Sequence, residues 1–273
     1  MLRGFYTAAS GMIAQQRRQE TLSNNIANAN TPGYKADDGS MRAFPELLIQ
    51  RMESNDIPTS RGLNLPVNQE VGSLNTGVYM QEAIPSFEQG DVRETGNETD
   101  MALVQGNLPD EEGSLFFTVQ TEDGERYTRN GNFTVDGEGF LTTNQGHYVL
   151  NQAGDPIQTG GMDFNVTNDG ILQVDDQEIP LGLSYSSNAN DLVKEGSGLF
   201  QLSEDGAPLL NARTEAGVTF NVRQSFLERS NVDAARTMAD MNRTYRSFEM
   251  NQRVLKMYDQ NMQQAVSQIG RLR

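Results

Sequence analysis

Few residues in this chain are of the types that perform catalysis or bind metals. The sequence has no cysteine and a single histidine, His147. Disulfides, thiolate metal sites, cysteine nucleophiles and sites with two histidine ligands are therefore excluded. A Ser-His-Asp arrangement would depend on His147 alone, which lies in a stretch typical of a hairpin. We interpret it as an exposed histidine at the end of a strand.

Motifs of nucleophile, phosphate and calcium sites are incomplete. The stretch EGSGL around Ser197 lacks G-x-S-x-G spacing, and VDGEGF lacks G-x-G-x-x-G spacing. Turn formation explains VDD and NDG without calcium. A catalytic carboxylate pair stays open because 37 Asp and Glu residues always allow one, but the chain has no Trp for a sugar subsite. We predict no catalytic residue, no cofactor, no metal and no small-molecule substrate.

Composition indicates a folded chain of one or two domains, with 36% hydrophobic and 21% charged residues among 273. No apolar run of membrane-spanning length and no apolar leader with a cleavage site are visible. We therefore expect neither a membrane span nor a conventional secretory signal, so any export would need another route.

Charge separates the ends of the chain from its middle. Residues 1–35 carry four basic and one acidic side chain, and residues 222–273 carry nine basic and five acidic, balances of +3 and +4. The middle keeps 8 basic against 31 acidic side chains, a balance of −23. Because an acidic centre repels nucleic acid and the ends lack a dense Lys/Arg run, we expect no nucleic-acid partner.

Glycine and proline follow the same division. Of the 26 glycines, 22 lie between residues 36 and 221, and all nine prolines lie between Pro32 and Pro208. The ends are therefore suited to helices and the middle to turns.

The C-terminal region predicts one long helix, from Ser230 to Leu272. Ser230 with Asp233 resembles a capping box. Apolar residues then recur at alternating steps of three and four, with polar breaks at Gln252 and Asp259, which is a heptad pattern. Its apolar members are Met238, Met241, Tyr245, Phe248, Leu255, Met262, Val266 and Ile269.

Such a stripe is too long for a compact middle domain to cover, and the N-terminus offers a partner helix. Its apolar face comprises Leu2, Phe5, Ala9, Met12, Leu22 and Ile26. Pairing of the two helices is the simplest arrangement, and Gln16 and Gln19 weaken that seam, which favours further partners in an assembly. The alternative is that both helices pack on the central domain as ordinary core elements.

The middle reads as short strands joined by polar turns. Asn130-Gly131, Asp136-Gly137 and Asn168-Asp169-Gly170 each separate runs rich in strand formers, which predicts hairpins. For the two dipeptides we expect type I′ turns, in which both central residues have φ > 0. The fold class is therefore α+β, with long terminal helices pairing as a coiled-coil-like domain and a central all-β domain. We divide the chain into an N-terminal helix with its exit (1–35), an extended or loosely ordered segment (36–85), the β domain (86–221) and the C-terminal helix (222–273).

The exit of the first helix, SNNIANANTPGYK, is rich in amides. Pro32 and Gly33 explain why the helix stops. They do not explain amides that begin at Asn24 while the apolar face still runs to Ile26, because Asn is a weak helix former. We predict that Asn24, Asn25, Asn28 and Asn30 bond to neighbouring chains.

Three stretches in the right order resemble one family. AASGMIAQQRRQETLSNNIANANTPGYK is similar to the N-terminal signature of bacterial flagellar rod and hook axial proteins, and FEQGDVRETGNETDMALVQG (87–106) and SNVDAARTMADMNRTYRSFEMN (230–251) agree with it. The residues that carry the N-terminal motif are Ser10, Gly11, Met12, Ser23, Asn24, Asn25, Asn28, Asn30, Thr31, Gly33, Tyr34 and Lys35. Length and a single β domain resemble the distal rod protein most. Residues 36–85 would match its extra segment.

The resemblance implies a structural subunit and not an enzyme. Such a subunit is exported by the flagellar type III apparatus without a cleaved signal and polymerises, with itself and other rod and hook subunits, into a helical tube of paired terminal helices. The tube transmits torque from motor to hook and lets export substrates pass. It belongs to the flagellar basal body outside the cytoplasmic membrane, where ring proteins and peptidoglycan are further candidate partners.

Two departures from the family pattern concern contacts. NLPDEEGSLFF inserts an acidic loop where the family continues from Gly106 into Gly-Phe-Phe, and Arg236-Thr237 replace a common acidic residue. The alternatives are a hook or other rod segment subunit and, in a different class, a secreted β-rich binding protein; an enzyme is the third. A binder would be a stable monomer with ordered termini, and an enzyme would have a deep pocket with a carboxylate of raised pKa.

Overall fold

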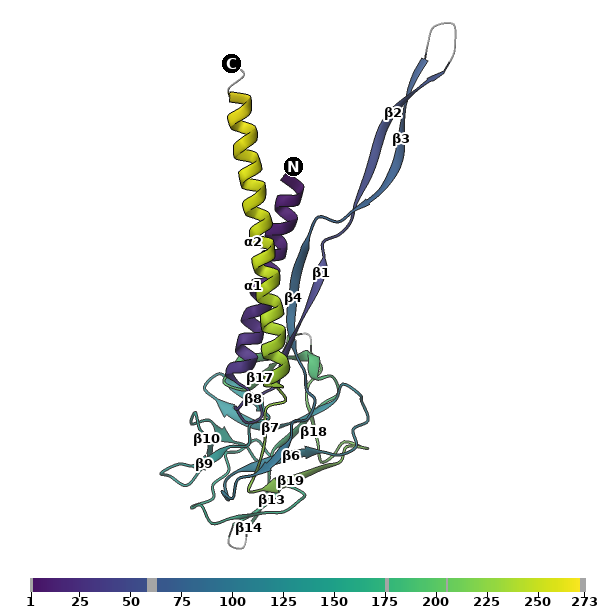
Figure 1. Ribbon diagram of the computed structural model, residues 1–273. Coiled ribbons are helices and arrows are strands. Elements are labelled where there is room, and N and C mark those ends of the chain that lie inside the picture. The colour runs from purple at the N-terminus through teal and green to yellow at the C-terminus, as the bar shows by residue number, and fades with distance from the viewer. Residues whose placement is uncertain (1, 58–62, 175–176, 205, 271–273) are drawn as a thin grey trace. The chain divides into compact units, whose positions relative to one another are not determined.

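The computed structural model describes residues 2–57, 63–174, 177–204 and 206–270. Two long helices, α1 (Leu2–Ala27) and α2 (Ala234–Gly270), lie at the two ends of the sequence, and the residues between them are rich in strands (Figure 1). This arrangement confirms the α+β class. Within the described part of the chain, neither helix has an apolar stretch that would cross a membrane.

The chain divides into two compact units, each of which is described by itself. The first, called the helical unit, comprises Met1–Ser23, Gly39–Ala83 and Met238–Arg273. The second, called the β unit, comprises Asn24–Asp38 and Ile84–Thr237. Each helix therefore has most of its length in the helical unit and a short end in the β unit.

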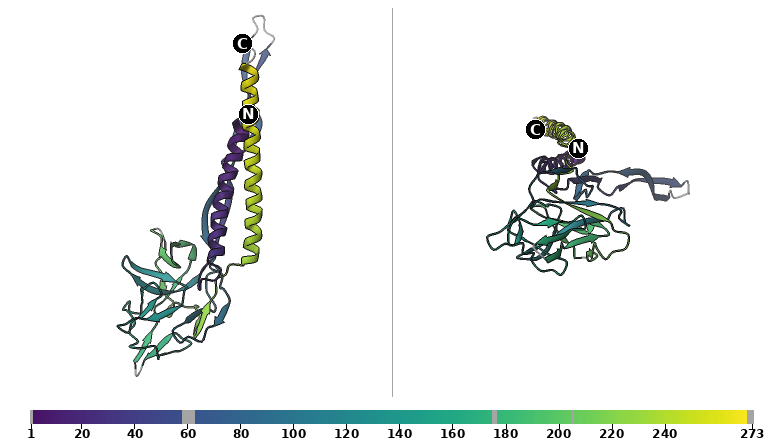
Figure 2. Two further views of the ribbon diagram at one scale, coloured as in Figure 1. Left: turned by 60° about the vertical axis from the view of Figure 1, so that its left-hand side comes forward. Right: turned by 90° about the horizontal axis from the view of Figure 1, so that it is seen from below.

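Two-stranded ribbons accompany the helices in the helical unit. Strand β1 (Asp37–Ala43) pairs with β4 (Val78–Pro85), and β2 (Leu47–Ile57) pairs antiparallel with β3 (Leu63–Leu74). These four strands account for most of residues 36–85, the range for which we expect an extended or loosely ordered segment. The described strands are extended and paired. In Figures 1 and 2, α1 and α2 run side by side in this unit.

Helix α2 begins at Ala234, so the expected start at Ser230 is wrong. The Asp233 carboxylate accepts hydrogen bonds from the amides of Ala235 (2.9 Å) and Arg236 (3.0 Å), which makes Asp233 the N-cap. The Ser230 hydroxyl instead accepts from the Val232 amide, in the chain before the helix. Leu272, the expected end, lies outside the described residues.

The β unit is built around a nine-stranded sheet. Its path is β16-β17-β8-β7-β11-β10-β9, and β15 joins β7 and carries β18. Smaller sheets are formed by β12-β13-β14, by β19 with β6 and by β20 with β5. The bounds are β5 Val92–Glu94, β6 Met101–Gln105, β7 Ser114–Thr121, β8 Gly124–Thr128, β9 Phe133–Val135, β10 Leu141–Thr143, β11 Tyr148–Val149, β12 Asn165–Val166, β13 Ile171–Val174, β14 Gln177–Pro180, β15 Leu183–Ser186, the 3-10 turn η1 Ala189–Asp191, β16 Leu192–Gly196, β17 Leu199–Leu202, β18 Leu210–Asn211, β19 Phe220–Gln224 and β20 Phe226–Glu228.

Strand β7 is the centre of the core because both of its faces are buried. Leu115, Phe117 and Val119 alternate into the main apolar cluster of the unit. Phe116 points to the opposite face, where its ring centroid lies 5.6 Å from that of Phe200 and 5.6 Å from that of Phe87. A continuous apolar run, and not an alternating one, is what such a strand requires.

Two of the predicted hairpin turns have different outcomes. Strands β12 and β13 pair antiparallel across Asn168-Asp169-Gly170, with Gly170 at φ +71°, so this hairpin is confirmed. The prediction of a hairpin at Asn130-Gly131 is wrong, because the flanking strands β8 and β9 do not pair with each other. Strand β8 pairs with β7 and β17, whereas β9 pairs with β10. Gly131 is required there for close packing, since a Cβ on it would collide with the Met101 carbonyl oxygen.

The Asp136-Gly137 turn is a hairpin of another geometry than the one predicted. It joins the paired strands β9 and β10, and the Asp136 carboxylate accepts from the amides of Glu138 (3.0 Å) and Phe140 (2.8 Å). The residue with positive φ is Gly139, at +86°, and not Gly137. An Asx turn therefore replaces the two-residue turn with φ > 0 at both central residues.

The two glycines give a matched test of packing. We expect Gly131→Ala to lower the free energy of unfolding by about 1–3 kcal/mol, because the added methyl group overpacks a site closed by backbone. Gly137→Ala has no heavy atom within 4 Å of the new Cβ, so it should be neutral or stabilise by a few tenths of a kcal/mol. Urea unfolding of the full-length chain measures both values. Equal effects would contradict the assigned packing at Gly131.

Candidate functional site

The predicted apolar series of α2 splits into two stripes. Met241, Phe248, Leu255 and Met262 are partly buried in the single chain. Met238 and Tyr245 are each 49% exposed and Val266 is 71% exposed. The side chain of Ile269 lies outside the described part. One stripe is therefore covered within the helical unit, and the other, which we call the open stripe (Met238, Tyr245 and Val266), is not.

Helices α1 and α2 approach most closely at two glycines. A Cβ on Gly4 would collide with the Tyr258 hydroxyl, and one on Gly11 would lie 3.0 Å from the Asn251 amide nitrogen. Moving along α1 from Gly4 to Gly11 therefore moves backwards along α2, so the helices run in opposite directions. Asn251 and Tyr258, with the buried Thr244, were not in the predicted series. Their seven-residue spacing was the signal that could have found them.

The predicted N-terminal interface residues are likewise on a partly covered face. Phe5, Ala9, Met12 and Leu22 are partly buried in the helical unit, and Ile26 is partly buried in the β unit. The side chain of Leu2 lies outside the described part. Within the same helix Tyr6 and Ile13 are exposed.

The Ser-Gly-Met part of the family motif lies in the helical unit. The Ser10 hydroxyl donates to the Thr7 carbonyl (2.9 Å) and accepts from the amide of Val78 in β4 (3.4 Å). Gly11 is buried at its contact with Asn251. Ser10 and Gly11 therefore have structural roles within the chain, and Met12 is partly buried beside them.

The amides of the exit loop fall into two groups in the β unit. Asn25 is buried, and its side chain donates to the Asp37 carbonyl (2.8 Å) and accepts from the Asp37 amide (2.9 Å). Asn28 bonds to Asn24 and Thr31 nearby in the chain. Ser23, Asn24 and Asn30 are exposed. Asn25 thus joins two parts of its own chain. Hydrogen bonds to neighbouring chains stay a prediction for the exposed amides of Asn24 and Asn30.

Glu228 is buried between two cations in the β unit. Its carboxylate accepts from the Lys35 ammonium (2.8 Å) and from the Arg129 guanidinium (2.6 and 2.9 Å), and all three residues are 1% exposed. Lys35 also donates to the Glu88 carbonyl (2.7 Å), and Gly90 donates its amide to Glu228 (2.9 Å). Every polar group of the cluster has a partner, as buried charge requires. We call these three residues the Glu228 cluster.

The cluster shifts the pKa values of its members. Burial, followed by repulsion from Arg129, lowers the pKa of Lys35 to about 8, although Glu228 opposes the shift. For Glu228, burial alone would raise the pKa, but Arg129 and Lys35 outweigh it and hold the pKa below its usual value. One carboxylate therefore stabilises two cations, and Lys35 is the member whose charge is least favourable.

A second polar cluster closes the same segment. The Lys194 ammonium lies 3.1 and 3.2 Å from the Asp37 carboxylate oxygens and 3.7 Å from the centroid of the Tyr34 ring. Tyr34 donates to Asn25 (3.2 Å), and burial together with Asp37 raises its pKa. Tyr34 and Lys35, the last residues of the family motif, thus face different partners of the β unit.

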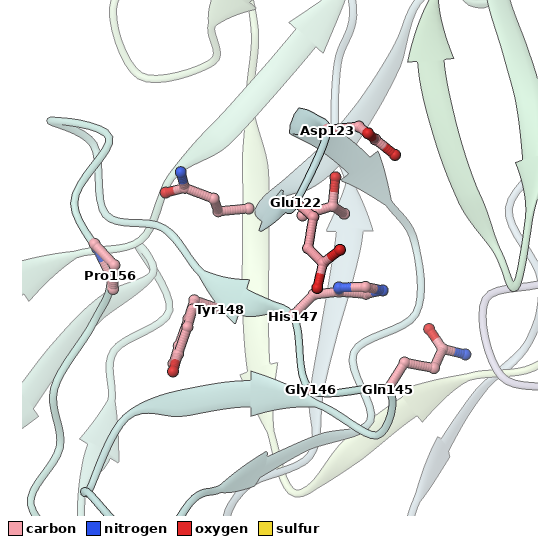
Figure 3. Close-up of a pocket in the computed structure, with 9 residues that line it drawn as sticks. Glu122, Asp123, Gln145, Gly146, His147, Tyr148 and Pro156 are labelled. Carbon is pink, nitrogen blue, oxygen red and sulfur yellow. The ribbon is translucent and has the colours of Figure 1, made fainter.

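His147 borders an open groove of about 660 Å³ (Figure 3). Glu122 and Asp123 come from the turn between β7 and β8, and Gln145 with His147 from the turn between β10 and β11. His147 is partly exposed, close to the strand-end position expected for it. Over the described residues, no group of three or more His, Asp and Glu side chains is placed to hold a metal ion.

The acidic insertion is held in one shape by the β unit. The Tyr185 hydroxyl donates to the Asp110 carboxylate (2.8 Å), and burial with this bond raises the pKa of Tyr185 to about 12. Asn190 donates to the Glu112 carboxylate (3.2 Å), and the Ala189 amide donates to the Glu112 carbonyl (2.9 Å). Glu111, between them, is exposed. The loop is thus a rigid acidic surface.

Comparison with known proteins identifies the class to which these features belong. Three family models match this chain: flagella basal body rod protein at residues 5–35, flagellar hook protein FlgE/F/G D1 domain at residues 112–174, and flagellar basal body rod FlgEFG protein C-terminal at residues 223–269. The three matches cover the Asn-rich exit, part of the central sheet and α2.

Relatives of the whole chain agree with these models. The flagellar hook-basal body complex protein FlhO of Bacillus subtilis is 42% identical over 279 residues, covering 100% of both chains. The flagellar basal-body rod protein FlgG of Agrobacterium fabrum is 31% identical, covering 95% of this chain and 96% of its own, and that of B. subtilis is 30% identical, covering 98% and 99%. The chain therefore belongs to the flagellar basal-body rod and hook protein family, which is one of structural proteins, and is distal rod-like within it.

The Glu228 cluster holds two cations but only one anion, so we expect substitutions of its members to lower the free energy of unfolding by different amounts. Glu228→Gln leaves two cations buried without a counter-ion, so we expect the free energy of unfolding to fall by about 3–5 kcal/mol. Lys35→Met leaves the Arg129–Glu228 pair intact and should cost clearly less. Urea unfolding of both full-length variants measures the difference. A larger loss for Lys35→Met would contradict this ranking.

The pKa of Lys35 predicts how stability changes with pH. Its pKa is about 8 in the folded chain and 10.5 ordinarily, so above pH 8 the unfolded chain binds more protons and folding gains stability from this group as pH rises. Between pH 7 and 9.5 the wild-type chain should gain about 1–2 kcal/mol relative to Lys35→Met. Urea unfolding at several pH values measures this gain. Parallel pH profiles would show that Lys35 keeps an ordinary pKa.

Proposed function

We propose that the chain is a distal-type subunit of the flagellar basal-body rod, which polymerises with itself and with other rod and hook subunits into a helical tube. The proposal is supported by relatives over the full chain that are named basal-body rod proteins. The observation that carries it physically is the open stripe of α2, with Met238, Tyr245 and Val266 exposed on a helix of 37 residues. The exposed Gln252 and Asp259 lie between Tyr245 and Val266 in this row, and we propose that a neighbouring subunit covers its apolar members.

The terminal helices would form the inner wall of that tube. We propose that α1 and α2 pair as a coiled-coil-like unit, with the glycine contacts setting their close approach and the open stripe left for neighbouring subunits. The exposed Asn24 and Asn30 would add hydrogen bonds between subunits. The function is then mechanical: the tube transmits torque and lets export substrates pass.

Partners and location follow from the same proposal. The subunit would reach the basal body through the flagellar type III export apparatus and assemble outside the cytoplasmic membrane, with ring proteins and peptidoglycan around it. The name of the FlhO relative, a hook-basal body complex protein, favours a second candidate position in another segment of the same axial structure.

The open stripe gives a test with a matched control. Tyr245 and Met250 are 49% and 59% exposed on α2, but only Tyr245 belongs to the stripe. We expect Tyr245→Asp to abolish complete basal bodies and swimming, because it places charge in a contact between subunits, whereas Met250→Asp should reduce swimming less than about twofold. Electron microscopy of basal bodies and soft-agar swimming measure the two effects.

Both variants should unfold in urea like the wild-type chain, which separates a lost contact from a lost fold. Complete basal bodies built from a stable Tyr245→Asp chain would refute the role of the stripe.

A further inference from the structure

Most basic side chains of the β unit are already engaged within the chain. Ion pairs join Arg126 to Glu195, Arg129 to Glu228 and Lys194 to Asp37. Arg213 donates to the Gly170 carbonyl (2.8 Å), and Arg223 lies over the Phe226 ring. Arg93 and Arg229 are exposed, and the described residues hold no ion-pair partner for them. Arg236 is likewise exposed and in none of the ion pairs among the described residues, so three cations of the β unit remain available, of which Arg93 and Arg229 lie together.

Arg93 and Arg229 line one groove. Its volume is about 390 Å³, and its walls come from the exit loop, β5 and β20. Asn30, Pro32 and Leu227 give it amide and apolar surface. Glu94 and Glu228 also line it, but the Glu228 carboxylate is buried and already paired with two cations, which leaves Glu94 against the two guanidinium groups. A concave surface with two cations suits a protruding carboxylate, since guanidinium groups bind carboxylates in a planar geometry.

The acidic insertion has the complementary charge. Pro109, Asp110, Glu111 and Glu112 are exposed, and the bonds to Tyr185, Ala189 and Asn190 fix the loop before any partner binds. A pre-formed loop loses little conformational freedom on docking. Glu111 is the carboxylate at its centre.

Groove and loop cannot meet within one chain. They lie at opposite ends of the ladder formed by β6 and β19, whose register runs from Met101 opposite Gln224 to Gln105 opposite Phe220. The groove residues are at the Gln224 end, where the Thr95 amide donates to Ser225, and the loop follows Gln105. A contact between them must therefore join two copies, and in a helical polymer it joins them head to tail. Such contacts are heterologous and produce rings or open helices.

We infer that the acidic loop of residues 109–112 docks into the groove of Arg93 and Arg229 on a neighbouring copy of this chain. The inference rests on the proposed function, because it needs a polymer in which copies meet head to tail. It assigns the insertion the role of a contact between β units, separate from the contacts of the helices.

A charge exchange between two full-length variants tests the contact. Arg93→Glu reverses one charge of the groove and Glu111→Lys reverses the central charge of the loop, so each variant alone should associate at least about tenfold more weakly than the wild-type chain. In an equimolar mixture, the new lysine of the Glu111→Lys loop meets the new glutamate of the Arg93→Glu groove, while the native groove and the native loop also pair. Association should then return to within about threefold of wild type. Sedimentation velocity at low and high salt measures all four samples.

Glu138→Lys is the control, because Glu138 is an exposed carboxylate on another turn of the β unit. It should associate like the wild-type chain. If it weakens association as much as Glu111→Lys does, only overall charge matters and the inference is overturned. Suppose that the wild-type chain associates. If Tyr245→Asp blocks this association but Arg93→Glu leaves it unchanged, the groove contact alone is overturned. If Tyr245→Asp leaves it unchanged, the role of the open stripe is overturned instead.

Cross-linking in cells decides the question where the purified chain stays monomeric. The absence of cysteine allows Arg93→Cys and Glu111→Cys to be placed together in an otherwise thiol-free chain. Oxidised basal bodies should give a ladder of linked copies from the double variant, whereas either single variant should give at most dimers. Basal bodies that form from the double variant without a ladder would overturn the inference, and the proposed rod function would stand.

Discussion

The buried carboxylate of Glu228 is the constraint on which the junction of the two chain ends depends. It lies just before α2, and it fixes Lys35 just after α1 and Arg129 at the end of β8. A buried anion cannot be left with one partner missing, so the three segments must be placed together. The backbone follows the same path, since the Gly33 amide donates to the Glu228 carbonyl (2.9 Å). The exit loop is thus held by both a buried ion pair and a backbone hydrogen bond to Glu228.

The family motif becomes understandable from this constraint. Gly33 has φ +68°, and a Cβ there would collide with the backbone of Arg129, so the close approach to the cluster needs glycine. Tyr34 then contacts Lys194 while Lys35 turns towards Glu228. Asn25 completes the turn by bonding both backbone groups of Asp37. Asn25, Gly33 and Lys35 belong to the family motif, and in this structure they make contacts between distant parts of the same chain.

The sequence predicted correctly those elements that depend on residues close together in the chain. It did not predict contacts between residues far apart in the chain. Heptad spacing predicted α2, and the turn residues predicted the β12–β13 hairpin. The Asn130-Gly131 prediction was wrong because the glycine is required by the Met101 carbonyl, a contact between residues far apart in sequence. The Glu228 cluster joins positions 35, 129 and 228, and no spacing rule links them. Likewise, Asn251 and Tyr258 were missed because a heptad of apolar residues excludes them, although they pack against Gly11 and Gly4 of α1.

The division of α2 into two stripes explains how one helix can serve both a chain and a polymer. The covered stripe has four apolar members, Met241, Phe248, Leu255 and Met262, which are partly buried in the chain itself. The open stripe has three, Met238, Tyr245 and Val266, and the exposed Gln252 and Asp259 interrupt it. Apolar side chains that the chain leaves exposed on α2 can be buried only where another chain contacts them. Any such contact stabilises the folded chain by mass action, so assembly and folding of this helix are coupled.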